Sequence, residues 1–114
     1  MKDSPLVIKS KSFALEIIKI CNQVKKEHKE SVLTNQLIHS GTSIGANIRE
    51  SIFAQGKADF VSKLQIALKE CSESEYWIEL LIESGCLINN DILEKCIEIK
   101  RLLISSINTS KSKK

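Results

Sequence analysis

The chain of 114 residues fits one domain, because domains usually contain about 100–150 residues. Its hydrophobic fraction of 42% and charged fraction of 27% indicate a folded chain, and its formal net charge of +3 is too small for binding of nucleic acid by total charge alone. No apolar run approaches the roughly 18–20 residues that cross a bilayer, and residues 1–5 lack a signal-peptide pattern. We therefore expect a cytoplasmic bacterial protein with no membrane contact.

Apolar residues recur at intervals of three and four along four segments, which is the spacing of one helix face. The segments begin their apolar stripes at Phe13, Leu33, Phe60 and Ile92. They predict helices near residues 9–29, 32–55, 59–84 and 90–108. Because the connections are short, neighbouring helices should be antiparallel. The predicted fold is all-α: one domain, residues 1–114, forming an antiparallel up-down-up-down four-helix bundle.

Residues that favour helix ends separate these segments. Ser31 and Asp59 are the predicted N-caps of the second and third helices, and Gly85 suits a left-handed C-cap. The run Asn-Asn-Asp at 89–91 predicts an N-cap and a first-turn acid for the last helix. Residues 109–114 are rich in serine and lysine and are predicted to form a frayed basic tail.

Neither the cysteines nor the histidines form a catalytic or metal-binding signature. The four cysteines, Cys21, Cys71, Cys86 and Cys96, are widely spaced without a C-x-x-C pair, so we expect free buried thiols in preference to disulfides. Cys21, Cys71 and Cys96 lie on apolar stripes, where a thiol packs as a small hydrophobe. A di-iron bundle needs Glu-x-x-His, yet Lys25 and Gln36 stand three residues before His28 and His39. We therefore expect no enzyme, no catalytic residues, no metal, no cofactor and no small-molecule substrate.

The segment 39–51 is unusual because it places two glycines inside a predicted helix. Each glycine there costs about 1 kcal/mol relative to alanine. Gly41 and Gly45 are four residues apart, so another helix could approach their shared face closely. A glycine-rich phosphate loop is the other reading, but no Gly-Lys-Ser/Thr follows and no strand precedes the segment. The spacing favours close helix packing.

Three polar residues of the same segment share one face next to the apolar stripe. Ser43, Asn47 and Glu50 follow the i, i+4, i+7 spacing. A polar cluster at a helix interface must be hydrogen-bonded, and it can then fix the register of the two helices. We interpret these residues as a structural polar motif facing the third predicted helix, with a ligand site as the alternative. The possible partners on that helix are Glu70, Glu73 and Ser74.

Charge is segregated along the chain. Residues 1–29 carry seven lysines against three acids, whereas residues 70–98 carry one lysine against eight acids. Residues 99–114 carry five basic residues and no acid. Glu75, Glu79 and Glu83 follow at i+4 steps and repel one another mildly unless basic groups lie nearby. The lysines of the first predicted helix could supply these groups within one chain or between chains, or the acidic surface could simply be solvated.

Tyr76 and Trp77 are adjacent on the third predicted helix, so they cannot both face one core. At least one should be exposed or should lie at an interface, where aromatic residues are enriched. We therefore assign a candidate oligomer interface to the aromatic pair and the neighbouring acids: Tyr76, Trp77, Glu75, Glu79 and Glu83.

Several motifs together resemble the bacterial four helix bundle protein family. They are the runs Gly41–Glu50 (GTSIGANIRE), Lys57–Phe60 (KADF), Lys63–Glu70 (KLQIALKE) and Glu75–Leu81 (EYWIELL). This family includes proteins encoded in intervening sequences of 23S ribosomal RNA genes and is related to the accessory protein of diversity-generating retroelements. The similarity covers about residues 10–107, with one departure at Ser51, where many members carry glycine.

The resemblance implies an up-down bundle, a homopentameric barrel, no known catalysis, and nucleic-acid binding through a basic surface. It also implies that Ser43, Asn47 and Glu50 are the family's motif residues, while no nucleic-acid contact residue can be transferred. Two functions therefore stay open. One is an oligomeric protein that binds RNA or DNA, and the other is an assembly or adaptor module whose partner is a protein. The candidate nucleic-acid-binding residues are Lys19, Lys25, Lys26, Lys29, Arg49, Lys100 and Arg101, with Lys9, Lys11 and the tail lysines as further basic groups.

Overall fold

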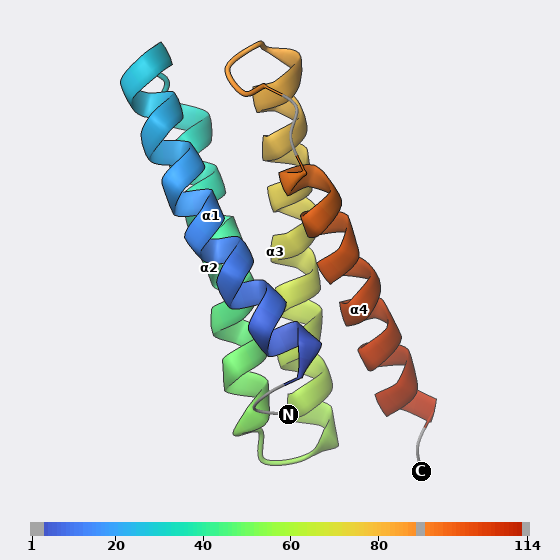
Figure 1. Cartoon of the computed structure of the whole chain (residues 1–114). Helices are drawn as coiled ribbons and strands as arrows, with labels where there is room; N and C mark the ends of the chain where they lie inside the picture. Colours follow the sequence, from blue (N-terminus) through green and yellow to red (C-terminus); the bar gives the residue numbers. More distant parts are fainter. Residues whose placement is uncertain (1–3, 89–90, 113–114) are drawn as a thin grey trace.

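The apolar stripes fold into four helices in the computed structural model, which describes residues 4–88 and 91–112 (Figure 1). The helices are α1 (Pro5–His28), α2 (Val32–Ile52), α3 (Lys57–Glu83) and α4 (Ile92–Ser112). Each packs on the next and α4 also packs on α1, whereas no Cα atoms of the diagonal pairs α1–α3 and α2–α4 lie within 8 Å of each other in the described ranges. The predicted antiparallel four-helix bundle is confirmed, and it measures 50 × 22 × 20 Å.

The core runs along the bundle axis and contains the predicted stripes of all four helices. Phe13, Ile44, Leu64 and Ile99 are each at most 1% exposed. Three serines on these stripes are buried as well: Ser40, Ser51 and Ser74. His28 ends the first predicted stripe but is exposed, because α1 ends at this residue and no neighbouring helix covers it.

Helix α1 begins four residues before the predicted start. The Ser4 hydroxyl accepts a hydrogen bond from the Val7 amide at 3.3 Å, and Pro5 occupies the first helical position. Proline fits there because its fixed φ suits a helix and its missing N–H would have no partner anyway. The pair Ser4-Pro5 is therefore a cap and a first-turn residue, and the prediction that the helix starts near residue 9 was wrong.

Ser31 is the N-cap residue of α2 as predicted, but its side chain makes no cap hydrogen bond, and the predicted N-cap Asp59 is displaced by Gly56. At the start of α2, the Glu30 carboxylate accepts instead from the amides of Leu33 at 2.8 Å and Thr34 at 3.0 Å. Gly56 is the N-cap of α3, which begins at Lys57. Asp59 lies in the first turn of the helix, where its carboxylate accepts from the Gln55 amide at 3.3 Å.

The C-cap at Gly85 is confirmed. Its φ of +83° is the left-handed conformation that glycine adopts without steric cost, and the Gly85 amide donates to the Ile82 carbonyl. The Cys86 amide donates to the Leu81 carbonyl at 3.0 Å, which completes a Schellman motif.

Helix α4 extends further than expected, so the prediction of a frayed tail from residue 109 was wrong for 109–112. Ile107 is 5% exposed, and this burial anchors the last turns of the helix to the core. The predicted N-cap at Asn89 and Asn90, together with Lys113 and Lys114, lies outside the described residues.

Candidate nucleic-acid interface

The lysines of α1 divide into two groups according to the face on which they lie. Lys9 pairs with Glu98 of α4 at 3.2 Å, on the same side of α1 as Glu16, which pairs with Lys95 of α4 at 2.6 Å. The other lysines of α1 and its C-cap residue have no ion pair within the described ranges; they are Lys11, Lys19, Lys25, Lys26 and, at the C-cap, Lys29. Helix α1 therefore presents unneutralised positive charge on the sides that do not face α4.

Of the seven predicted nucleic-acid-binding residues, six have no ion pair in the described part of the chain and one does. Lys100 donates to the Glu75 carboxylate at 2.6 Å, so it links α4 to α3. This hydrogen bond raises the pKa of Lys100. Because Glu75 neutralises its charge, Lys100 is a poor candidate for a phosphate contact. Arg101, one residue further, is exposed.

The six residues do not form one patch. Lys19, Lys25, Lys26 and Lys29 follow the C-terminal half of α1, whereas Arg49 is near the C-terminal end of α2 and Arg101 is on α4. Since α1 and α2 are antiparallel, Arg49 lies beside the N-terminal half of α1 instead (Figure 1). The structure thus separates the basic end of α1 from Arg49.

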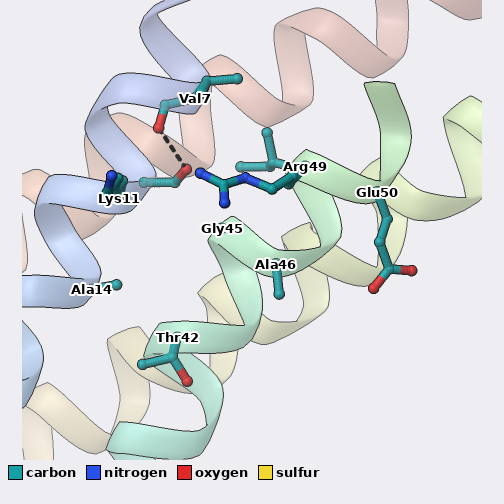
Figure 2. Close-up of a pocket in the computed structure, with 10 residues that line it drawn as sticks. Val7, Lys11, Ala14, Thr42, Gly45, Ala46, Arg49 and Glu50 are labelled. Atoms are coloured by element: carbon teal, nitrogen blue, oxygen red, sulfur yellow. Dashed lines mark hydrogen bonds between the residues drawn. The ribbon is translucent and has the colours of Figure 1, made fainter. Parts of the chain in front are cut away.

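Arg49 lines a groove of about 430 Å³ between α1 and α2. Lys11 lies on the α1 side, and Figure 2 shows the Arg49 guanidinium extending from α2 toward α1. Val7, Ala14 and Ala46 also line the groove and make its wall partly apolar. Sequence reasoning named Lys11 and Arg49 separately and missed the groove, because only the packing of α1 on α2 brings them to one place.

The predicted polar motif does not form the expected hydrogen bonds to α3. Ser43 donates to the His39 carbonyl at 2.6 Å, and Asn47 donates to the Ser43 carbonyl at 2.9 Å, both within α2. A serine or asparagine inside a helix can reach a carbonyl four residues back, and this local bond has replaced the cross-helix one. Only Glu50 reaches α3, through an ion pair with Lys63 at 3.2 Å.

A different pair of serines joins α2 to α3. The hydroxyls of Ser40 and Ser74 are 2.8 Å apart, and both residues are at most 1% exposed. A polar residue on the apolar stripe of each of two neighbouring helices was the signal for this contact. The structural polar contact is therefore buried beside the core.

The adjacent aromatic residues divide as expected, with Tyr76 53% exposed and Trp77 partly buried against the core. Their ring centroids are 5.2 Å apart. Within the described ranges the Trp77 indole N–H is buried without a hydrogen-bond partner. This placement leaves Tyr76 as the aromatic residue that a partner could contact.

The acidic residues of α3 are not neutralised by α1 within one chain. Helices α1 and α3 are diagonal in the bundle, and none of their Cα atoms lie within 8 Å of each other in the part of the chain that the structure describes. Glu75 pairs with Lys100 of α4 instead, while Glu83 is exposed. The exposed Glu83 has no ion pair in the described residues and is therefore available to the lysines of a second copy of the chain.

Exposed apolar side chains on α1 form a feature that the sequence analysis did not identify. Ile8, Leu15 and Ile18 are 58%, 61% and 39% exposed. On α3, Ile66 and Tyr76 are 42% and 53% exposed. Because these residues lie on diagonal helices, they belong to two different surfaces of the bundle.

Metal and membrane signatures are not found in residues 4–88 and 91–112. No three His, Cys, Asp or Glu side chains there gather as metal ligands. None of the helices in these ranges is long and apolar enough to cross a membrane.

Comparison with known proteins places this architecture in a family. The model of the 23S rRNA-intervening sequence protein family matches residues 2–105. A crystal structure of a protein of unknown function from Bacteroides thetaiotaomicron, described as a member of the S23 ribosomal protein family, is 47% identical. The match has a TM-score of 0.87 and covers 90% of this chain and 97% of that one. No curated protein matches the chain.

Proposed function

The chain belongs to the 23S rRNA-intervening sequence protein family, as the sequence resemblance predicted, and we propose that it is a non-enzymatic homo-oligomer that binds nucleic acid in the cytoplasm. The observation that carries this proposal is the set of α1 lysines without an ion pair. Three of them, Lys25, Lys26 and Lys29, fall within five residues at the C-terminal end of the helix. This local concentration of charge supports phosphate binding better than the net charge of +3 does.

Lysine ammonium groups bind phosphates as point charges and release condensed counterions when they do. Such contacts carry no base information, so we propose binding that tolerates sequence changes and weakens with salt. A few lysines per chain give weak binding alone. An assembly that presents several copies of this surface would bind more tightly through multivalency.

The first prediction concerns these lysines. Wild-type protein should retain both RNA and DNA on a filter at about 50 mM salt and lose most of the complex at about 200 mM. Lys26→Gln or Lys29→Gln should make the plot of log affinity against log salt shallower by about 0.7 for a single strand. The measurement is a salt titration of binding to a labelled oligonucleotide.

The matched control is Lys9→Gln, which removes the same formal charge from the same helix. Lys9 is already paired with Glu98, so its replacement should leave the salt dependence nearly unchanged. An equal effect of all three variants would contradict the assignment of the phosphate contacts to the end of α1. Retention of neither RNA nor DNA by the wild type would overturn nucleic-acid binding and leave the protein-assembly module as the function.

For the homo-oligomer, we propose contact between the α1 outer face, defined here as Ile8, Leu15 and Lys19, and the exposed side of α3 in a second copy. Lys11 lies beside this face, on the side of α1 that is turned toward α2, and stays uncovered. The α3 surface offers Ile66 and Tyr76 as apolar groups and Glu83 as an exposed acid. The two surfaces differ, so the contact is heterologous and forms a ring if the rotation closes. The family resemblance implies five subunits. The lysines beyond this face, from Lys25 to Lys29, would remain available for phosphate.

The second prediction tests this contact by light scattering at micromolar concentration. Wild-type protein should have a mass several times the 12.8 kDa of one chain, and Leu15→Glu should reduce it to that of a monomer. Leu15 is 61% exposed, so glutamate there does not disturb the core. Ile104→Glu on α4 is the control, since Ile104 is 41% exposed but lies outside the proposed contact. A monomeric wild type would rule out the assembly.

A further inference from the structure

We propose that the groove between α1 and α2 holds one nucleotide of a single-stranded nucleic acid, with its phosphate between Lys11 and Arg49. This inference rests on the proposed nucleic-acid binding and assigns it a discrete site. The groove is distinct from the lysines at the C-terminal end of α1, because Lys11 and Arg49 lie at the opposite half of the α1–α2 pair.

The electrostatics of the groove favour an anion. Neither Lys11 nor Arg49 has an ion pair within the described ranges, and both side chains are exposed. Glu50 is the single acid among the lining residues, but Figure 2 shows its carboxylate pointing away from Arg49. That carboxylate pairs with Lys63 of α3 at 3.2 Å. The groove therefore presents two positive charges with no negative charge directed into it.

The shape of the groove results from small residues where α1 approaches α2. Gly45 lies against Ser10, so that a Cβ at this position would be 3.4 Å from the Ser10 hydroxyl oxygen. Ala14 and Ala46 leave the space on either side unfilled. The resulting volume of about 430 Å³ is within the range of small-ligand sites.

The two hydroxyls at the groove are engaged within their own helices. Ser10 donates to the Val7 carbonyl at 3.3 Å, and Thr42 donates to the Ile38 carbonyl at 2.7 Å. Neither hydroxyl proton is then directed at a ligand, so attraction of an anion depends on Lys11 and Arg49. The planar guanidinium of Arg49 can bind two phosphate oxygens at once, and Lys11 can add a third contact.

The concave and partly apolar form of the groove selects a single strand over a duplex. The bases of a duplex are paired and stacked, so a whole nucleotide can enter the groove only at the cost of unpairing and unstacking. A single strand can turn one nucleotide out of its stack. The apolar lining from Val7, Ala14 and Ala46 would then contact the sugar or the base while the cations hold the phosphate.

The test combines charge removal with steric filling. Arg49→Gln and Lys11→Gln remove the cations, and Ala46→Leu fills the groove while leaving all charges in place. Ala46 is exposed on α2 and leucine is a good helix former, so the fold should be retained. The controls are Lys69→Gln, an exposed α3 lysine without an ion pair in the described residues, and Ala58→Leu, an exposed position at the start of α3.

The probes are fluorescein-labelled U12 and dT12 oligonucleotides and a 12-base-pair duplex, with anisotropy measured at about 0.1 M salt. Each of the three groove variants should bind U12 or dT12 about five- to tenfold more weakly than the wild type, which is the effect of losing one phosphate contact at this salt. The controls should stay within about twofold, and duplex binding should change little. Comparison of U12 with dT12 shows which single strand the groove takes.

Each other outcome overturns a defined part of the proposal. Equal losses in the Lys69→Gln control and the groove variants would show diffuse electrostatic binding, which removes the groove but keeps the proposed function. Full binding by Ala46→Leu would exclude entry into the groove. Equal competition by polyglutamate would show a site for acidic peptide instead of phosphate. No binding of any probe by the wild type would remove the proposed function together with the groove. Circular dichroism confirms that each variant is folded.

Discussion

Replacing Gly41 by leucine should lower the free energy of unfolding by about 2–3 kcal/mol, although leucine forms helices better than glycine. A Cβ at position 41 would lie 3.1 Å from Cγ2 of Ile17 and 3.3 Å from its Cγ1. Ile17 is completely buried, so the surrounding core side chains oppose its displacement. The rest of the leucine side chain would then force α1 from α2 along the whole interface, and overpacking of this kind costs more than the gain in helix propensity.

The measurement is urea denaturation followed by circular dichroism, with Gly45→Ala as the matched control. A Cβ at position 45 would lie 3.4 Å from the Ser10 hydroxyl, which is close to an ordinary contact. Gly45→Ala should therefore raise the free energy of unfolding by up to about 1 kcal/mol through helix propensity. Replacement of glycine should thus lower the free energy of unfolding at position 41, where the new side chain meets Ile17, and raise it at position 45, one helical turn away.

A double substitution separates the steric cause from other effects. Ile17→Ala alone should cost about 2–5 kcal/mol because it leaves a cavity in the core. In that background, Gly41→Leu should become neutral or stabilising, since the leucine side chain would fill the space. Equal costs of Gly41→Leu in both backgrounds would show that Ile17 is not the obstacle.

The bundle could be predicted from the sequence because its cause is local. The spacing of apolar residues determines which face of each helix is buried, and that spacing is visible without any tertiary information. The helix ends were harder, since caps depend on which of several polar residues takes the position. Ser4 caps α1 and Glu30 caps the start of α2, yet neither was distinguishable from other polar residues nearby.

The candidate site was only partly predictable, because it depends on which charges meet across helices. Lys100 and Arg101 are adjacent in sequence, but only Lys100 reaches Glu75, so one charge is neutralised and the other is exposed. The groove joins Lys11 and Arg49 across 38 positions of sequence. Their proximity follows from the register of α1 on α2, which the close contact at Gly41 and Gly45 helps to set. No local pattern in the amino-acid sequence reveals the register of two helices.

The rates at which the four cysteines react should differ by roughly a thousandfold or more. A core thiol reacts only after the bundle opens, and this opening requires much of the free energy of unfolding. All four are free, and Cys21, Cys71 and Cys96 are buried while Cys86 is only partly buried. The sulfurs of Cys71 and Cys96 are 3.8 Å apart, and each thiol donates to the other residue's carbonyl, at 3.3 and 3.4 Å. We expect one fast and three slow reactions with dithiobis(nitrobenzoic acid) at pH 8, and Cys86→Ser should remove the fast one. Two or more fast thiols would contradict the burial of Cys21, Cys71 and Cys96.

The protection of these thiols should also depend on pH in a defined direction. Burial raises the pKa of Cys21 from its ordinary value of 9.0 to about 11, although Lys25 opposes the shift. The hydrogen bond with Cys71, together with burial, raises the pKa of Cys96 as well. Below about pH 9 both the folded and the unfolded chain keep the Cys21 proton, so this thiol does not lower the free energy of unfolding there. Between about pH 9 and 11 only the unfolded chain releases it, which favours opening by roughly tenfold per pH unit. The rate of Cys21 relative to Cys86 should therefore rise across this range, and a constant ratio would show that Cys21 is ionised in the folded core.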